Sequence, residues 1–203
     1  MKEKIPLNRA YRALYPRFTV LVTSGTLETP NVMTASWNTP LSANPPLVGV
    51  LIAEKRYSFE LIRKMGEFGI CVPPIELAQE TLQVGSISGR DKNKFLNSHA
   101  FTIEQGTKIA APMIKECPIN LECKLEGIIP TGDHHLFIGR VLAGKSTSGC
   151  WDSWGPIVSS VKACYWRNSR ELDVYTLHSS DSEKHKLINI LIDGEFYVLA
   201  NGF

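Results

Sequence analysis

A basic turn at the start of a predicted helix is the part of this sequence best suited to bind an anion. Lys55, Arg56 and Ser58 stand between an apolar run, 47–54, and an amphipathic segment, 58–65. Backbone N–H groups at a helix N-terminus attract negative charge, and two cations and a hydroxyl group strengthen that attraction. The pattern indicates an anion site. The alternative is an ordinary capped helix that follows a basic turn.

Small residues and cations are mixed in a second segment, 86–95, which includes Ser88, Gly89 and Lys94. It follows a second predicted helix, which we expect to begin at Pro74 and to end at Gly85. The segment could close over the same anion, or it could be a solvated surface loop.

A third candidate is the extended run 31–38, in which small hydroxyl-bearing side chains alternate with bulkier ones. Such a strand allows its backbone and hydroxyl groups to approach a flat polar ligand closely. The alternative is an edge strand with one solvated face. The residues of this run that we single out are Asn31, Met33, Thr34, Ala35, Ser36 and Trp37.

The elements that must position these residues are mostly strands. Alternation and turn residues predict strands over 17–23 and 31–38, which would form a hairpin, and over 47–54, 68–72, 119–129, 135–143, 163–167, 172–177 and 187–199. The helix over 58–65 would have Ser58 as its N-cap and Gly66 as its stop. Many strands, two short helices and no regular βαβ alternation favour a barrel with peripheral helices.

Composition excludes several classes of protein. The 203 residues fit one domain, and 22 Lys and Arg against 20 Asp and Glu leave too little positive charge for a dedicated nucleic-acid binder. The longest apolar run, 47–53, is far too short for a membrane helix, and the N-terminus lacks a signal-peptide pattern, so we expect a cytoplasmic protein. Five cysteines without a CxxC pair predict reduced thiols and no metal site.

Six motifs in order resemble the flavin reductase-like, FMN-binding split-barrel family, and most closely its ferric reductase and flavoredoxin-type branch. They are NVMTASW, SANPPLVGVLI, KRYSFELI, GEF, SGRDKNKF and GDHHLFIGRV. The resemblance spans about 15–175 of a single domain over 1–203, with 176–203 as a C-terminal extension. It implies a six-stranded antiparallel Greek-key split barrel with flanking short helices, in a homodimer with FMN near the interface.

The resemblance also assigns roles. It implies that Asn31, Met33, Thr34, Ala35, Ser36 and Trp37 line the flavin ring and the ribityl chain, and that Lys55, Arg56 and Ser58 hold the phosphate, with Ser88 and Gly89 close by. Lys94 takes the place of the flavin-contacting lysine, with Lys92 as its competitor. In the GDH motif, His134 faces the flavin or a nicotinamide, and its neighbour His135 would point the other way. Tyr165 or Trp166 would supply an aromatic group.

The implied function is an FMN-binding oxidoreductase. Electrons would pass from NAD(P)H or a protein donor through bound FMN to free flavin, ferric complexes or a quinone-like acceptor. The alternatives are a non-catalytic flavoredoxin-type electron carrier with a ferredoxin-like partner, and a binding barrel that has lost its cofactor. No essential catalytic side chain is expected, and His134 is the one residue nominated to contact the hydride donor.

Overall fold

The computed structural model describes residues 2–15, 17–96 and 100–150 in full, and between 151 and 200 only the backbone of short strands. Its helices are η1 (Leu7–Leu14), α1 (Tyr57–Met65), η2 (Ile75–Leu77) and α2 (Ala78–Ser86). Its strands up to residue 146 are β1 (Arg17–Phe18), β2 (Val20–Gly25), β3 (Pro30–Ala35), β4 (Asn38–Ser42), β5 (Leu47–Ile52), β6 (Glu67–Val72), β7 (Ile103–Glu104), β8 (Met113–Ile114), β9 (Ile119–Pro130) and β10 (His135–Ser146).

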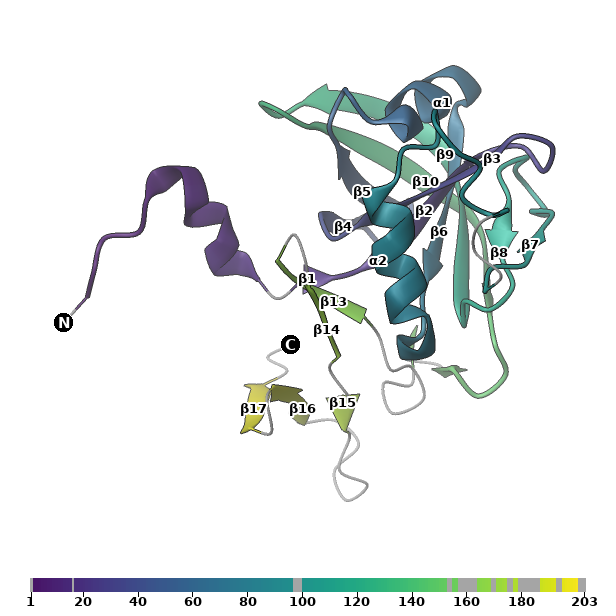
Figure 1. Ribbon diagram of the computed structural model, residues 1–203. Coiled ribbons are helices and arrows are strands. Elements are labelled where there is room, and N and C mark those ends of the chain that lie inside the picture. Colours follow the sequence, from purple (N-terminus) through teal and green to yellow (C-terminus); the bar gives the residue numbers. More distant parts are fainter. Residues whose placement is uncertain are drawn as a thin grey trace.

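One antiparallel sheet of seven strands organises the described part of the chain, with the order β3-β2-β6-β9-β10-β5-β4. Figure 1 shows the sheet curling around, with α1 at one end and α2 lying across its strands. The mainly β architecture with few short helices confirms the predicted fold class. The strand count is seven rather than six. The run 31–38 is not one strand, because β3 ends at Ala35, and β4 lies almost wholly beyond this run, where the sequence predicted no strand.

The two edge strands of this sheet, β3 and β4, are consecutive in the chain. Only Ser36 and Trp37 separate them, so the opposite edges of the sheet must lie close together. The Arg17 side chain donates hydrogen bonds to the carbonyl oxygens of Ser36, at 3.1 Å, and Asn38, at 3.2 Å. The Leu51 N–H donates to the Trp37 carbonyl at 2.9 Å. The sheet is thereby curled into a partly closed barrel whose seam is this two-residue link.

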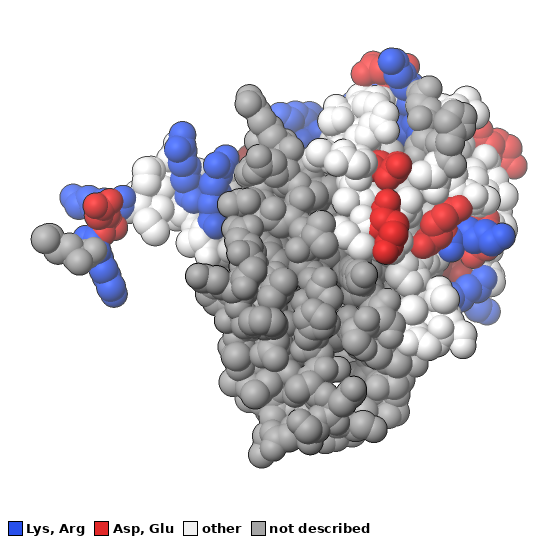
Figure 2. Space-filling view, turned by 60° about the horizontal axis from the view of Figure 1, so that its bottom comes forward, with Lys and Arg blue, Asp and Glu red and all other residues white. Residues whose placement is uncertain are grey.

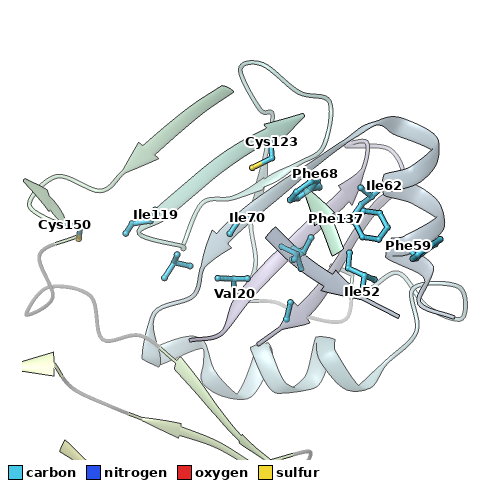
Figure 3. Close-up of a cluster of buried hydrophobic side chains, with 14 residues drawn as sticks. Val20, Ile52, Phe59, Ile62, Phe68, Ile70, Ile119, Cys123, Phe137 and Cys150 are labelled. Carbon is cyan, nitrogen blue, oxygen red and sulfur yellow. The ribbon is translucent and has the colours of Figure 1, made fainter. Parts of the chain in front are cut away.

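The strand predicted over 17–23 is divided at Thr19 into β1 and β2, and β2 pairs with β3 as the predicted hairpin and is buried on both faces. Val20 and Val22 point into the barrel interior, and Leu21 points into a second core beneath α2. Figure 3 shows the interior core, in which Phe59 of α1 packs edge-to-face on Phe137 with ring centroids 5.1 Å apart. Burying such side chains stabilises the fold by about 1.5–3 kcal/mol each.

Both helices occur where the sequence predicts them, but their ends differ in two details. The first begins at Tyr57 with Arg56 as its N-cap residue, so Ser58 lies inside the first turn and is not the N-cap. Gly66 ends this helix with a φ of 73°, as expected of a left-handed stop. In the second, Pro74 precedes the 3-10 turn η2 and α2 runs past Gly85 to Ser86.

The chain beyond residue 150 contains further strands. They are β11 (Trp151–Asp152), β12 (Gly155–Pro156), β13 (Cys164–Asn168), β14 (Glu171–Val174), β15 (Leu177–His178), β16 (Leu187–Ile192) and β17 (Glu195–Ala200). Of these, β13 and β14 lie near the predicted strands 163–167 and 172–177, the predicted run 187–199 is divided into β16 and β17, and the short strands β11, β12 and β15 were not predicted. β13 pairs with β1 and β14, and β16 with β15 and β17. The side chains of Tyr165 and Trp166 lie outside the described residues.

The N-terminal segment projects from the sheet (Figure 1) and none of the residues of η1 is buried. Figure 2 shows that Lys and Arg predominate on it. No helix in the described part of the chain is long and apolar enough to cross a membrane.

A buried carboxylate holds a loop against the sheet. Glu122 of β9 is 2% exposed and accepts hydrogen bonds from the N–H groups of Thr107, Lys108 and Ile109 at 2.6–3.2 Å and from the Thr107 hydroxyl at 2.7 Å. Burial alone would raise the pKa of Glu122, but these hydrogen bonds together outweigh it and lower the pKa. The charged form therefore stabilises the fold.

We predict that Glu122→Gln lowers the free energy of unfolding by about 2–3 kcal/mol at pH 7, because an amide NH₂ would face backbone donors. A carboxyl group with a lowered pKa contributes stability above its unfolded pKa of about 4.3, and this stability is lost as the pH falls through the folded pKa. Urea unfolding at pH 3–7 should therefore show a weaker acid dependence in the variant than in the wild type.

The control is Glu126→Gln on the same strand, where the carboxylate is exposed and paired with Arg140 at 2.5 Å. Such a surface pair contributes less than about 1 kcal/mol. Equal losses for the two variants would contradict the role given to Glu122.

Candidate functional site

A single cavity of about 860 Å³ brings the three candidate segments together. It lies at the seam of the sheet, between the β3–β4 link, the start of α1 and the loop that follows α2. All the predicted binding residues line it: Asn31, Met33, Thr34, Ala35, Ser36, Trp37, Lys55, Arg56, Ser58, Ser88, Gly89, Lys94 and His134. The structure shows that these residues lie around one cavity. That they contact a ligand stays a prediction.

Lys94 is a buried cation at the wall of this cavity. It is 6% exposed, and its Nζ donates hydrogen bonds to the carbonyl oxygens of Val32, at 2.6 Å, and Val84, at 2.8 Å. Val84 lies in the last turn of α2, where carbonyl groups lack helical partners and carry partial negative charge. Lys94 therefore joins β3 to the end of α2. Lys92, its competitor, is exposed and outside the cavity.

Three cations, Lys55, Arg56 and Lys94, line this cavity together with one carboxylate, that of Asp133. Burial, and then the charge of Arg56, lower the pKa of Lys94 to about 8. Within residues 2–15, 17–96 and 100–150, neither Lys94 nor Arg56 forms an ion pair with a carboxylate. Lys94 is buried, and a buried charge is costly unless it is paired, whereas Arg56 is exposed. The excess of cations over carboxylates makes the cavity electrostatically suited to an anionic ligand.

The hydroxyl group of Ser58 points toward β3 at the start of α1. Asn31, 2% exposed, donates from Nδ2 to the oxygen of Ser58 at 2.8 Å and to that of Ser24 at 3.0 Å. This network fixes the first turn of α1 against the sheet. It also explains why Ser58 is buried although it does not cap the helix.

The loop after α2 packs closely against the Asn31–Ser58 hydrogen-bond network, because Gly89 has no side chain. A Cβ atom at Gly89 would lie 2.2 Å from Oδ1 of Asn31 and 2.9 Å from the ring of Tyr57. Only glycine fits here. Gly85 makes a similar approach in α2, because its Cβ would lie 2.9 Å from the hydroxyl of Thr34, which donates to the Thr81 carbonyl at 2.5 Å.

The two adjacent histidines point in different directions, as the sequence predicts. His134 lines the cavity, with its ring centroid 4.7 Å from that of Trp37 and its Nδ1 2.7 Å from Oδ1 of Asp133. His135 packs on Phe59, with ring centroids 5.0 Å apart. Of the pair, His134 is thus the one that can contact a ligand in the cavity.

The sequence did not predict several residues that line the cavity. Leu7, Asn8 and Tyr11 of η1, together with Tyr15, lie along one side of the cavity. Tyr11 packs edge-on against Trp37 at 5.4 Å between centroids, and the Trp37 indole donates to the Tyr15 hydroxyl at 2.9 Å. Nothing in the charged N-terminal sequence indicated such a role. Tyr57 also lines the cavity, and its place between Arg56 and Ser58 could have indicated it.

Comparison with protein families matches residues 11–152 to the family described as the flavin reductase like domain. This span is most of the chain. The chain belongs to the flavin reductase-like family. A protein of Archaeoglobus fulgidus is 46% identical to it over 129 residues, which are 64% of this chain and 72% of the relative.

Solved structures agree with this membership. Flavoredoxin of Desulfovibrio vulgaris (Miyazaki F) is 25% identical, with a TM-score of 0.77 over 91% of this chain and 98% of its own. An FMN-binding protein from Thermus thermophilus, solved with bound 1-cyclohex-2-enone, is 29% identical, with a TM-score of 0.74 over 86% and 94% of the two chains. These likenesses confirm the resemblance drawn from the six motifs and its split-barrel fold.

We predict that Lys94→Met weakens FMN binding at pH 7 at least tenfold more than Lys92→Met does, because only Lys94 brings its charge into the cavity. The wild-type affinity should also fall as the pH rises through about 8. A bound phosphate favours the charged ammonium, so binding takes up a proton above the pKa of the free protein. Quenching of flavin fluorescence measures both effects.

In Lys94→Met the fall in affinity above pH 8 should disappear, whereas Lys92→Met should keep it. If the larger loss occurs with Lys92→Met, the lysine that faces the ligand has been assigned wrongly.

Proposed function

We propose that this protein is an FMN-dependent oxidoreductase whose cavity holds the flavin mononucleotide with its phosphate at the start of α1. The observation that carries the proposal is the pair of cations without carboxylate partners, Arg56 and Lys94, in one cavity. A phosphate monoester carries nearly two negative charges at neutral pH, which matches this pair. Family membership supports flavin as the class of ligand.

Several residues would hold the phosphate. Backbone N–H groups in the first turn of α1 lack helical partners and favour an anion. Arg56 lies at the N-cap position and Ser58 is the second residue of the helix, and Ser88 and Gly89 line the cavity nearby. This arrangement uses a helix start and cations rather than a glycine-rich nucleotide loop.

The flavin ring would lie toward the seam of the sheet. The small side chains of Thr34, Ala35 and Ser36 line the cavity there, and Trp37 and His134 form an aromatic wall. FMN supplies the redox chemistry when it is bound, and the chain orients it and limits access of water. His134 would contact a hydride donor at this wall.

The donor that we propose is NAD(P)H or a reduced protein, and the acceptor free flavin, a ferric complex or a quinone-like compound. The second candidate function is a flavoredoxin-type electron carrier that exchanges electrons with a ferredoxin-like protein, supported by the likeness to the Desulfovibrio flavoredoxin. We also propose that the protein is a homodimer with FMN near the subunit interface.

We predict that Arg56→Met with Ser58→Ala weakens FMN binding about a hundredfold, and binding of riboflavin, which lacks the phosphate, less than about threefold, because two contacts to a charged group are lost. Fluorescence quenching measures the two affinities. Thermal unfolding of the flavin-free variant shows whether the fold is retained.

Arg63→Met is the control, because Arg63 lies on the same helix, exposed, with its guanidinium 5.7 Å from the Phe59 ring centroid. It should bind FMN as the wild type does. Equal losses of FMN and riboflavin affinity in the double variant would rule out the phosphate assignment.

For the enzyme, we predict steady oxidation of NADH or NADPH with ferricyanide or free flavin as acceptor, at rates proportional to the FMN bound. The decrease in absorbance at the nicotinamide band measures this rate. Rates at the background level with both nucleotides, in protein that does contain FMN, would favour the carrier.

A further inference from the structure

The anion site at the cavity is made of two parts that are far apart in the chain. One is the start of α1, 55–58, and the other is the 86–89 loop after α2. Gly89 must seat closely against Asn31 and Tyr57 to complete the site. Residues that hold the two parts together would therefore control how well the site fits a phosphate.

Arg90, which lies outside the cavity, contacts both parts. Its Nη1 donates to the carbonyl oxygen of Lys55 at 3.1 Å, and its Nη2 forms an ion pair with Glu60 of α1. The guanidinium also lies over the ring of Tyr57, 5.3 Å from the centroid. One side chain thus contacts Lys55 in the basic turn that precedes α1, Tyr57 at the first position of the helix and Glu60 in its first turn.

Backbone hydrogen bonds link Arg90 and the residues after it to Ser88 in the loop. The Arg90 N–H donates to the Ser88 hydroxyl at 3.2 Å. The N–H groups of Asp91 and Lys92 donate to the Ser88 carbonyl at 3.2 Å and 3.3 Å. Ser88 and Gly89 are therefore part of a compact turn whose position depends on where Arg90 is bound.

We infer that Arg90 and Glu60 form a positioning pair that seats the 86–89 loop on α1, so that FMN affinity depends on an ion pair that does not touch FMN. This inference rests on the proposed function. The guanidinium has its charge neutralised by Glu60 and lies against Tyr57, which makes it a structural bridge and not a phosphate ligand.

The alternative role, a direct phosphate ligand, predicts the opposite effect of changing Glu60. If Arg90 bound phosphate directly, Glu60→Gln would free the guanidinium and remove a negative charge near the anion, so FMN would bind as tightly as before or more tightly. If the pair positions the loop, Glu60→Gln weakens FMN binding although it removes a repulsive charge. The sign of the change distinguishes the two roles.

The experiment compares the affinities of the full chain for FMN and riboflavin, measured by fluorescence quenching, in Arg90→Met and Glu60→Gln. We expect FMN binding to weaken roughly tenfold in Arg90→Met and about threefold in Glu60→Gln, with riboflavin binding within about twofold of the wild type. The matched control is the surface pair Arg140–Glu126, in which Arg140 has the same 41% side-chain exposure as Arg90. Arg140→Met and Glu126→Gln should change neither affinity.

Three outcomes would overturn the inference. They are unchanged or tighter FMN binding in Glu60→Gln, unchanged FMN binding in Arg90→Met, and equal losses for FMN and riboflavin, which would show a general effect on the fold. A wild-type protein that binds neither flavin would instead overturn the proposed function, so the two failures are distinguishable.

Discussion

The link between β3 and β4 is the constraint on which the rest of the structure depends. Two residues, Ser36 and Trp37, join the opposite edges of a seven-stranded sheet, so the sheet has to curl and its edges have to meet. The two residues of this link belong to neither edge strand, so their backbone is not part of a regular β-sheet hydrogen-bond ladder. The cavity lies there because closure of the barrel is incomplete, and the side chains of the link become its wall.

Electrostatics then determines what this cavity can hold. The seam brings β3 beside α1 and α2, and with them Arg56 and Lys94 into one cavity. Lys94 is held by the carbonyl oxygens of Val32 and Val84, which compensate part of the cost of its burial but do not neutralise it. In the proposed function, a phosphorylated ligand would supply the missing negative charge. The same hydrogen bonds join α2 to the sheet, so the stability of the fold and the affinity for such a ligand would be coupled at this one lysine.

Much of this could be predicted from the sequence, and the physical reasons for success and failure differ. The Gly66 stop is a local signal and is found in the structure, whereas the strand predicted over 17–23 is divided into β1 and β2, because β1 pairs with the distant strand β13 in another sheet. Ser58 was misassigned as an N-cap because its real partner, Asn31, comes from a distant strand. The helix α2 runs one residue past Gly85, and the missing side chain there allows the close approach to Thr34, which comes from a distant strand. Tyr11 of η1 reaches the cavity only through tertiary packing on Trp37, and no periodicity in its own segment shows this.

The most direct test of the central claim is the visible absorbance spectrum of the purified protein, with identification of the flavin that heat releases from it. The cation pair in the cavity predicts a two-banded yellow spectrum, or its appearance when FMN is added, with FMN as the released species. A colourless protein that takes up no added FMN, or one that releases only unphosphorylated riboflavin, would contradict the account of the cavity as a phosphate-binding flavin site.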